Sequence, residues 1–201
     1  MEIQTAHLAR TNETKGTKMT PEFICQKQHL AARILREAGI AVTEAEENNI
    51  EICDYDLGRY SEIGTAILIY VNTERCCAKE MVLEEGQLCP EHYHPPLPHY
   101  HYSGKEETFR CRKGTVWLYV EGEPTEAPGF AVPADKKDCF TVWHEVRLTP
   151  GEQYTLKPNT KHWFAAGKGG AIISEFSTPS FDLSDVFTDP EITRISNIST
   201  H

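Results

Sequence analysis

The sequence lacks long apolar runs and lacks an excess of positive charge. Its longest purely apolar run covers only residues 66–71, whereas a helix that spans a membrane needs about 20 such residues. Lys and Arg together number 20 and Asp and Glu number 30, which gives a net charge of −10 over 201 residues. We therefore expect no membrane span and no nucleic-acid partner, because binding to phosphates requires a basic face.

The cysteine pattern argues against a secreted domain held together by disulfides. The chain has 7 cysteines, an odd number, and none of them form a CxxC pair. A chain of this length can bury an adequate core without crosslinks. The first residues also lack a basic segment followed by an apolar one. These features predict free thiols in a reducing, cytoplasmic compartment.

Two helices are predicted near the N-terminus. Apolar residues recur with helical spacing over residues 21–38. Thr20 is a suitable N-cap, Pro21 suits the first helical position, and Gly39 is a suitable stop after the helix. Residues 43–46 have the spacing of a capping box, which predicts a second, short helix.

From about residue 50 the pattern becomes that of a mainly β fold. Short runs rich in β-branched and aromatic residues alternate with Gly and Pro, which is typical of an antiparallel sandwich or barrel. The predicted strands cover residues 65–72, 78–83, 87–94, 107–120, 140–148, 153–156, 161–165 and 171–176. Prolines exclude a central strand over residues 95–104 and predict a loop there. The expected organisation is a flexible tail (1–19), an N-terminal helical segment (20–50), a β-barrel domain (51–192) and a C-terminal tail (193–201).

Histidines are concentrated around this loop. His92 and His94 share one face of a predicted strand and Tyr93 points the other way, because side chains on a strand alternate. Two imidazoles side by side suit a metal ion, although an isolated pair of this kind is more often solvated or packed in a core. His99 and His101 lie in the loop without fixed strand geometry, so we expect them near the mouth of a site.

The wider spacing resembles the two motifs of the cupin superfamily. Glu107 follows His94 after 12 residues, and His162 follows Gly151 after 10. Cupins are small double-stranded β-helix barrels, also called jelly rolls, with three histidines and one glutamate around a metal. The resemblance implies that His92, His94 and Glu107 form the first motif and that His162 belongs to the second.

Two departures from the cupin pattern need a structural explanation. The gap between the second histidine and the glutamate is much shorter in the familiar motif, so residues 95–104 must bulge outward for Glu107 to return beside His94. Lys157 and Asn159 stand where proline and glycine are usual. Asn tolerates a positive φ better than most residues, so the turn can persist.

Each of the later ligands has a simpler alternative. Glu107 could be a solvated charge at a strand edge. However, period two places it on one face with Phe109 and Cys111, where a carboxylate is poorly solvated and needs a partner such as a cation. His162 lies beside Trp163 and could be a packed core histidine.

The chain is also similar to a narrower family, the cupin-type D-lyxose isomerases, over about residues 35–192. The similarity is carried by residues 70–75, 79–83, 89–96, 107–112, 118–122, 141–145, 158–164 and 187–190. Members interconvert D-lyxose and D-xylulose, and many also act on D-mannose and D-fructose. They use a divalent ion, commonly manganese, and form dimers. The resemblance therefore implies a metal-dependent aldose–ketose isomerase with a sugar substrate and a homodimeric assembly. Iron, cobalt, nickel and zinc also suit mixed nitrogen and oxygen ligands, and the sequence does not rank them.

Aldose–ketose isomerisation moves a proton between C1 and C2 through a cis-enediol, so it needs a Lewis acid and a base. The resemblance suggests Glu175 as the base. Burial in an apolar β run would raise the pKa of such an acid, whereas the alternative is that Glu175 points outward. Lys79 is the candidate cation for stabilising enediolate charge, and its alternative is a surface lysine paired with Glu80.

Four further residues are expected near the substrate. His144, Glu145 and Asp189 match positions of the family but have no assigned role. Tyr93, like the tyrosines of residues 95–104, could stack on a sugar or simply cover the barrel.

Two other functions stay open at this point. The first is another metal-dependent cupin enzyme, such as an iron dioxygenase, which would consume oxygen. The second is a cupin that binds sugars without turnover. The presence of Glu175 and Lys79 beside a full ligand set favours an enzyme.

Overall fold

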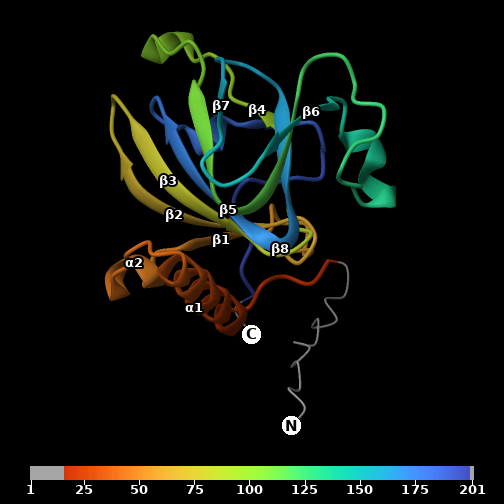
Figure 1. Cartoon of the computed structure of the whole chain (residues 1–201). Coiled ribbons are helices and arrows are strands. Elements are labelled where there is room, and N and C mark those ends of the chain that lie inside the picture. Colours follow the sequence, from red (N-terminus) through yellow and green to blue (C-terminus); the bar gives the residue numbers. More distant parts are fainter. Residues whose placement is uncertain (1–15, 200–201) are drawn as a thin grey trace.

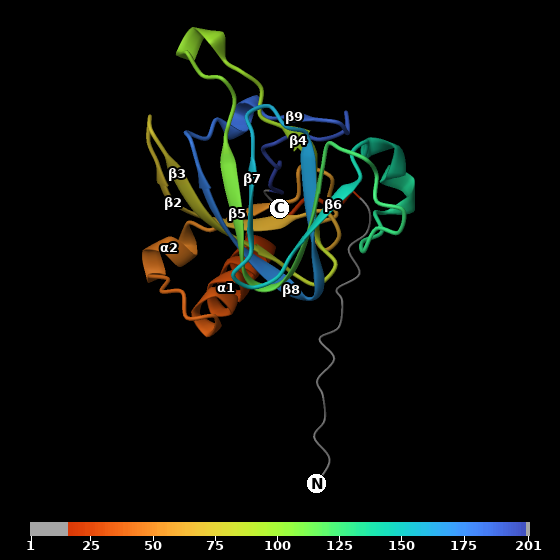
Figure 2. The same cartoon turned by 45° about the horizontal axis from the view of Figure 1, so that its top comes forward.

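A computed structural model describes residues 16–199, which form a curled β-sheet with two helices packed on its outer side (Figures 1 and 2). The helices are α1 (Pro21–Glu37) and α2 (Glu44–Asn48). The strands are β1 (Glu51–Cys53), β2 (Thr65–Asn72), β3 (Cys77–Leu83), β4 (Leu88–Tyr93), β5 (Glu107–Val120), β6 (His144–Leu148), β7 (Gln153–Leu156), β8 (His162–Ser177) and β9 (Val186–Phe187). Short 3-10 turns are η1 (Pro98–Tyr100), η2 (Ala134–Cys139) and η3 (Asp182–Ser184).

Both predicted helices and their caps are confirmed. The Thr20 side chain accepts a hydrogen bond from the Phe23 N–H at 3.2 Å. Thr43 and Glu46 form the reciprocal capping box, since each side chain bonds to the other residue's backbone N–H. Gly39 follows α1 with a φ of 79°. Within the described residues, no helix is long and apolar enough to cross a membrane.

The sheet is organised around the long strand β8. Its first part pairs with β4 and its last part pairs with β3, both antiparallel. β5 pairs with β8 along nearly its whole length and also pairs with β6 and β7. The paired strands β5 and β8 therefore form a long ribbon that connects β3 and β4 with β6 and β7. The two ends of this ribbon approach each other inside the barrel.

The ribbon bends where two glycines meet. Gly114 has a φ of 80°, and a Cβ built on it would lie 2.0 Å from the carbonyl oxygen of Gly170. The pairing register of β5 and β8 shifts on both sides of this point. Close backbone contact of this kind is possible only for glycine.

Two apolar cores hold the layers together. The larger lies inside the barrel and includes Trp163, which stacks on Tyr119 with ring centroids 3.9 Å apart. The smaller joins the helices to the outer face of the sheet and includes Leu35, Ile50 and Ile172. The N-terminal helical segment is therefore packed on the barrel and does not form a separate unit.

The mainly β class with an N-terminal helical segment is confirmed, and the predicted strands over residues 65–72, 107–120 and 153–156 match the structure. The runs over residues 161–165 and 171–176 are one strand, because the glycines between them bend the ribbon without ending it. The first residues of the run over 140–148 are not in a strand, since β6 begins at His144. β1 and β9 were too short to give a sequence signal.

The two expected tails differ. Residues 1–15 of the N-terminal tail lie outside the described residues, whereas Met19 is buried against the helices. Residues 193–199 return to the barrel and do not extend away from it. The Thr193 N–H donates to the Tyr55 carbonyl oxygen at 3.1 Å, and the Arg194 side chain bonds to Glu51.

The close contact between Gly114 and Gly170 leads to a prediction about stability. Gly114→Ala should lower the free energy of unfolding by several kcal/mol, because it adds a backbone clash to the strain of about 1–2 kcal/mol expected for a left-handed residue. The matched control is Gly151→Ala, which has a similar φ of 95° but no atom within 4 Å of its built Cβ. Urea unfolding followed by circular dichroism measures both, and equal losses in the two variants would contradict the role of the bend.

Candidate metal centre and active site

Three histidines converge inside the barrel. β4 directs His92 inward and ends just before His94, while His162 opens β8 directly opposite, paired in register with His92. Each offers one nitrogen, and the three nitrogens lie within 4.8 Å of one another. All three side chains are buried.

Each imidazole is oriented by its Nδ1 atom. The Nδ1 of His92 lies 2.8 Å from the carbonyl oxygen of Pro90, and the Nδ1 of His162 lies 3.0 Å from that of Thr160. With Nδ1 donating to a carbonyl, the Nε2 atom of each ring is the unprotonated nitrogen that a metal ion can use.

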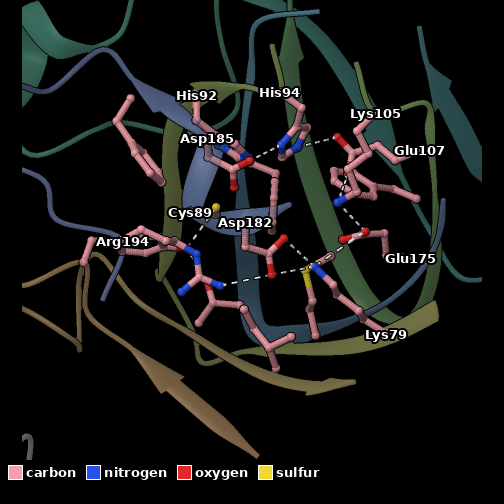
Figure 3. Close-up of a pocket in the computed structure, with 17 residues that line it drawn as sticks. Lys79, Cys89, His92, His94, Lys105, Glu107, Glu175, Asp182, Asp185 and Arg194 are labelled. Atoms are coloured by element: carbon pink, nitrogen blue, oxygen red, sulfur yellow. Dashed lines mark hydrogen bonds and ion pairs between the residues drawn. The ribbon is translucent and has the colours of Figure 1, made fainter. Parts of the chain in front are cut away.

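His94 is oriented by a carboxylate instead. Its Nδ1 lies 2.5 Å from Asp185 Oδ1 (Figure 3). Carboxylate–histidine pairs of this kind fix the ring and raise its basicity as a ligand. The C-terminal segment that carries Asp185 is therefore part of the site.

Glu107 completes the cluster. Its Oε1 lies 3.1 Å from His94 Nε2 and 3.2 Å from His162 Nε2. These three atoms are buried, and none has a hydrogen-bond partner among the described residues. Burying such polar atoms without a partner is costly. A divalent ion where they converge would satisfy all of them, and three nitrogens and one oxygen suit a transition metal. The residues therefore fit a metal ion.

The electrostatics of the cluster agree with this fit. Burial and the neighbouring imidazoles lower the pKa of His92, and burial lowers that of His162, so both rings are neutral. Burial opposes ionisation of Glu107, but Lys105 and His94 hold its pKa well below the usual range. Burial also opposes protonation of His94, yet the carboxylates of Glu107 and Asp185 raise its pKa to about 9. A cation would therefore have to displace a proton from His94.

Glu175 lies on the same side of the pocket, next to two lysines. It is buried on β8, and Lys105 Nζ lies 2.5 Å from its Oε1 (Figure 3). Ser177 Oγ donates to the same oxygen at 3.1 Å, and Lys79 Nζ lies 3.9 Å away. Lys105 also contacts Glu107 Oε2 at 2.9 Å. One ammonium group thus links the predicted base to a predicted metal ligand.

Lys79 continues the chain of charges. Its Nζ lies 3.1 Å from Asp182 and 3.0 Å from Ser180 Oγ. Asp182 in turn lies 3.4 Å from Arg194. Burial opposes the charged form of Lys79, but Glu175 raises its pKa. For Asp182, burial opposes ionisation, but Lys79, Lys105 and the Ser180 hydroxyl together lower the pKa. Both groups therefore stay ionised.

These side chains line one pocket of about 420 Å³, part of it open to solvent. Its cations are Lys79, Lys105 and Arg194, and its carboxylates are Glu107, Glu175, Asp182 and Asp185. If the imidazoles are neutral, these three cations and four carboxylates have a net charge of −1. A bound divalent ion would change the net charge of the pocket to +1. A pocket of this charge favours a substrate that develops negative charge.

The structure thus brings six predicted residues to one place. Four of them surround a common point, namely His92, His94, Glu107 and His162, while Glu175 and Lys79 flank it. Glu175 and Lys79 both point inward, so the surface alternatives for these two residues are excluded.

The other four predicted residues do not line this pocket. Tyr93 is half-buried on the opposite face of β4. His144 is exposed and contacts the Glu123 carbonyl oxygen. The remaining two are held elsewhere: Glu145 accepts hydrogen bonds from Tyr119 and Gly129, and Asp189 pairs with Lys136. Their contact with substrate stays a prediction that this pocket does not support.

Four charged residues of the site had no signal in the sequence. Asp182, Asp185 and Arg194 lie in an irregular C-terminal stretch without periodicity. Lys105 precedes β5 next to the exposed Glu106, although Lys105 itself is buried. The only usable clue was its position two residues before Glu107, which places the two side chains on the same side of an extended chain.

The loop of residues 95–104 bulges out between His94 and Glu107, as the long gap requires. Asn159 has a φ of 63°, so it takes the conformation expected of the residue that replaces glycine in the second motif. The mainly β barrel is the cupin-like fold that the sequence predicts.

The sequence matches the protein-family model described as D-lyxose isomerase over residues 19–201. A D-lyxose ketol-isomerase of Thermofilum sp. (strain ex4484_79) is 53% identical over 180 residues, which cover 90% of this chain and 99% of that protein. A D-lyxose/D-mannose isomerase of Thermosediminibacter oceani is 57% identical over 164 residues, covering 82% and 90%. The chain belongs to the D-lyxose isomerase family, and the predicted enzyme class, an isomerase, is confirmed.

Solved structures share the fold. The L-ribose isomerase of Acinetobacter sp. DL28, in complex with L-ribose, superposes with a TM-score of 0.77 at 15% identity, covering 92% of this chain and all of that one. The ligand-free L-ribose isomerase of Cellulomonas parahominis gives a TM-score of 0.75 at 17% identity, with the same coverage. At this identity the similarity concerns the fold.

The unpartnered atoms of the cluster make a prediction about metal binding. Glu107→Gln should weaken binding of Mn²⁺ or Co²⁺ by at least about 10-fold, because it removes the anionic ligand. The matched control is Glu106→Gln at the exposed neighbouring position, which should bind as the parent does. Calorimetric titration of the metal-free proteins measures the affinities. Unchanged affinity in Glu107→Gln would mean that the ligand set is misassigned.

Proposed function

We propose that this protein interconverts D-lyxose and D-xylulose, and also D-mannose and D-fructose, by proton transfer through a cis-enediol. The observation that carries the proposal is the position of Glu175. This buried carboxylate is held by Lys105, which also contacts Glu107 of the His–Glu cluster. The names of the two relatives described above, a D-lyxose ketol-isomerase and a D-lyxose/D-mannose isomerase, support the choice of sugars.

We assign the cluster of His92, His94, Glu107 and His162 to a divalent metal ion, with manganese as the first candidate and iron, cobalt, nickel or zinc as alternatives. When bound, the ion would act as a Lewis acid that polarises the sugar oxygens next to the reacting carbons. The unpartnered nitrogen and oxygen atoms of the cluster support this assignment.

Glu175 is the general base in this proposal. A carboxylate can remove the proton from one of the two reacting carbons and return it to the other, because one face of the substrate is presented to it throughout. Lys105 and Lys79, whose Nζ atoms lie 2.5 and 3.9 Å from its Oε1, hold this carboxylate in place. Glu175 both accepts and releases the proton, so Lys79 and Lys105 need not take part in the proton transfer.

The lysines supply fixed positive charge. Burial opposes the charged form of Lys105, but Glu107 and Glu175 raise its pKa well above the usual value, so it remains an ammonium ion. Lys105 and Lys79 therefore stabilise negative charge that develops on the substrate oxygens. Since both are already oriented by carboxylates, little reorganisation is required during the reaction.

The assembly and location are proposed on other grounds. Ile69, Tyr70 and Val71 on β2 and Phe176 on β8 are exposed although they are large and apolar. Such a patch supports a homodimer. All seven cysteines are free, which supports a reducing, cytoplasmic environment.

Isomerase activity is tested directly. The purified protein with Mn²⁺ should convert D-lyxose and D-mannose to their ketoses without consuming oxygen, and a chelator should abolish turnover until metal is restored. In D₂O, product and recovered aldose should carry deuterium on the reacting carbons, because a carboxylic acid exchanges its proton with solvent. Oxygen consumption would favour a dioxygenase, and binding of sugar without turnover would favour a non-catalytic cupin. Turnover without any deuterium incorporation would contradict proton transfer by an exchangeable base.

The role of Glu175 makes a separate prediction. Glu175→Gln should lower kcat about 10²–10⁴-fold, the usual contribution of general acid–base catalysis, while metal content stays at the parental level. Glu106→Gln again serves as the control and should keep full activity. A kcat within about tenfold of the parent would rule out Glu175 as the base.

A further inference from the structure

The loop of residues 95–104 is fixed at both ends to the candidate site. It starts directly after His94 and ends directly before Lys105. Its last residue, Gly104, has a φ of 102°, and a Cβ there would lie 2.9 Å from the His94 carbonyl oxygen. The base of the loop is therefore closed tightly beside two groups of the pocket.

The loop is ordered by its own contacts and by two tyrosines, since Tyr100 also packs against Phe181 with ring centroids 5.6 Å apart. Leu97 and Tyr102 exchange two backbone hydrogen bonds, of 2.8 and 3.3 Å. The Tyr102 hydroxyl donates to the Pro179 carbonyl oxygen at 2.8 Å, and its ring packs edge-on against Phe181 with centroids 5.0 Å apart. The loop thus contacts the segment that follows β8, which we call the 179–185 segment.

The 179–185 segment carries two carboxylates of the site. Asp182 directly follows the phenylalanine that Tyr102 contacts, and it lies 3.1 Å from Lys79. Asp185 lies 2.5 Å from His94 Nδ1 (Figure 3). One short segment therefore sets the position of a proposed catalytic lysine and of a proposed metal ligand.

Other contacts hold the start of the segment and its first carboxylate. The Asn72 side chain exchanges two hydrogen bonds with the Ser180 backbone, and Arg194 contacts Asp182. The backbone hydrogen bonds of η3 are internal: Ser184 N–H donates to the Phe181 carbonyl oxygen at 2.7 Å, and Asp185 N–H to that of Asp182 at 3.4 Å. A second, small cavity, partly open to solvent, lies between the segment and the loop and is lined by Leu97, Tyr102, Phe181 and Asp185. Loss of the Tyr102 ring would enlarge this cavity and let the segment shift.

We propose that Tyr102 is a positioning residue for the isomerase site, because it holds Phe181 and thereby keeps the carboxylates of the 179–185 segment on Lys79 and His94. The kinetic part of this inference rests on the proposed function, whereas the part that concerns His94 does not. In this proposal the loop between His94 and Glu107, which accounts for their long separation in sequence, helps to position the site.

The experiment compares three variants. Tyr102→Ala removes the ring and the hydroxyl, Tyr102→Phe removes only the hydroxyl, and His99→Ala is the control because His99 is an exposed side chain of the same loop. For each, kcat and KM for D-lyxose are measured with Mn²⁺. The affinity for Co²⁺ and the visible spectrum of bound Co²⁺ are measured without substrate.

Tyr102→Ala should lower kcat and Co²⁺ affinity by about 10-fold or more, as expected when the partner of a metal-binding histidine is displaced. It should also alter the Co²⁺ spectrum, with KM changed less than kcat. Tyr102→Phe should recover most of the loss, since the ring contact remains, and His99→Ala should match the parent.

Two results would overturn the inference: parental kcat, affinity and spectrum in Tyr102→Ala, or equal losses in His99→Ala, which would indicate a general disturbance of the loop. If the parent turns over no sugar, the proposed function fails, and the Co²⁺ measurements alone decide whether Tyr102 positions His94.

Discussion

The structure depends on one buried carboxylate. Glu107 is removed from water and placed against two imidazoles and an ammonium group, so its charge has to be balanced by its neighbours. Lys105 neutralises one oxygen, while the other faces nitrogen atoms that have no partner of their own among the described residues. A divalent ion would satisfy that second oxygen and both nitrogens together. The other charged side chains of the pocket form a chain of ion pairs in which cations and carboxylates alternate.

The bent β5–β8 ribbon makes this arrangement possible. Glu107 and His162 stand at opposite ends of the ribbon in terms of strand pairing, since Glu107 pairs with Ser177 and His162 pairs with Val120. They meet only because the ribbon bends back on itself at its glycines. Glu175 is at the same end of the ribbon as Glu107, because it pairs directly with Phe109. The fold thus gathers the proposed base and the candidate ligands from β4, β5 and β8 and from the residue that follows β4.

The sequence was informative where the backbone is regular. Period two correctly placed Glu107 on a buried face, and the HxH spacing correctly placed His92 and His94 together, because strands impose alternation on every residue. Irregular segments impose no such rule. For this reason Asp182 and Arg194 could not be found, although in the folded chain Asp182 contacts Lys79 and Arg194 contacts Asp182. The gap of 12 residues was predicted to bulge outward, but its contact with the 179–185 segment depends on tertiary structure alone.

The shared ribbon has a consequence for how the protein would gain the proposed cation. The four side chains of the cluster come from strands whose contacts are far apart in sequence, so the binding geometry exists only after the whole barrel has closed. Long-range pairing of this kind is completed late and slowly in folding. An ion that binds only the closed barrel shifts the equilibrium toward it by mass action. Metal supply would then set the resistance of the entire domain to heat and denaturant, and metal-starved chains would be the ones most exposed to proteolysis.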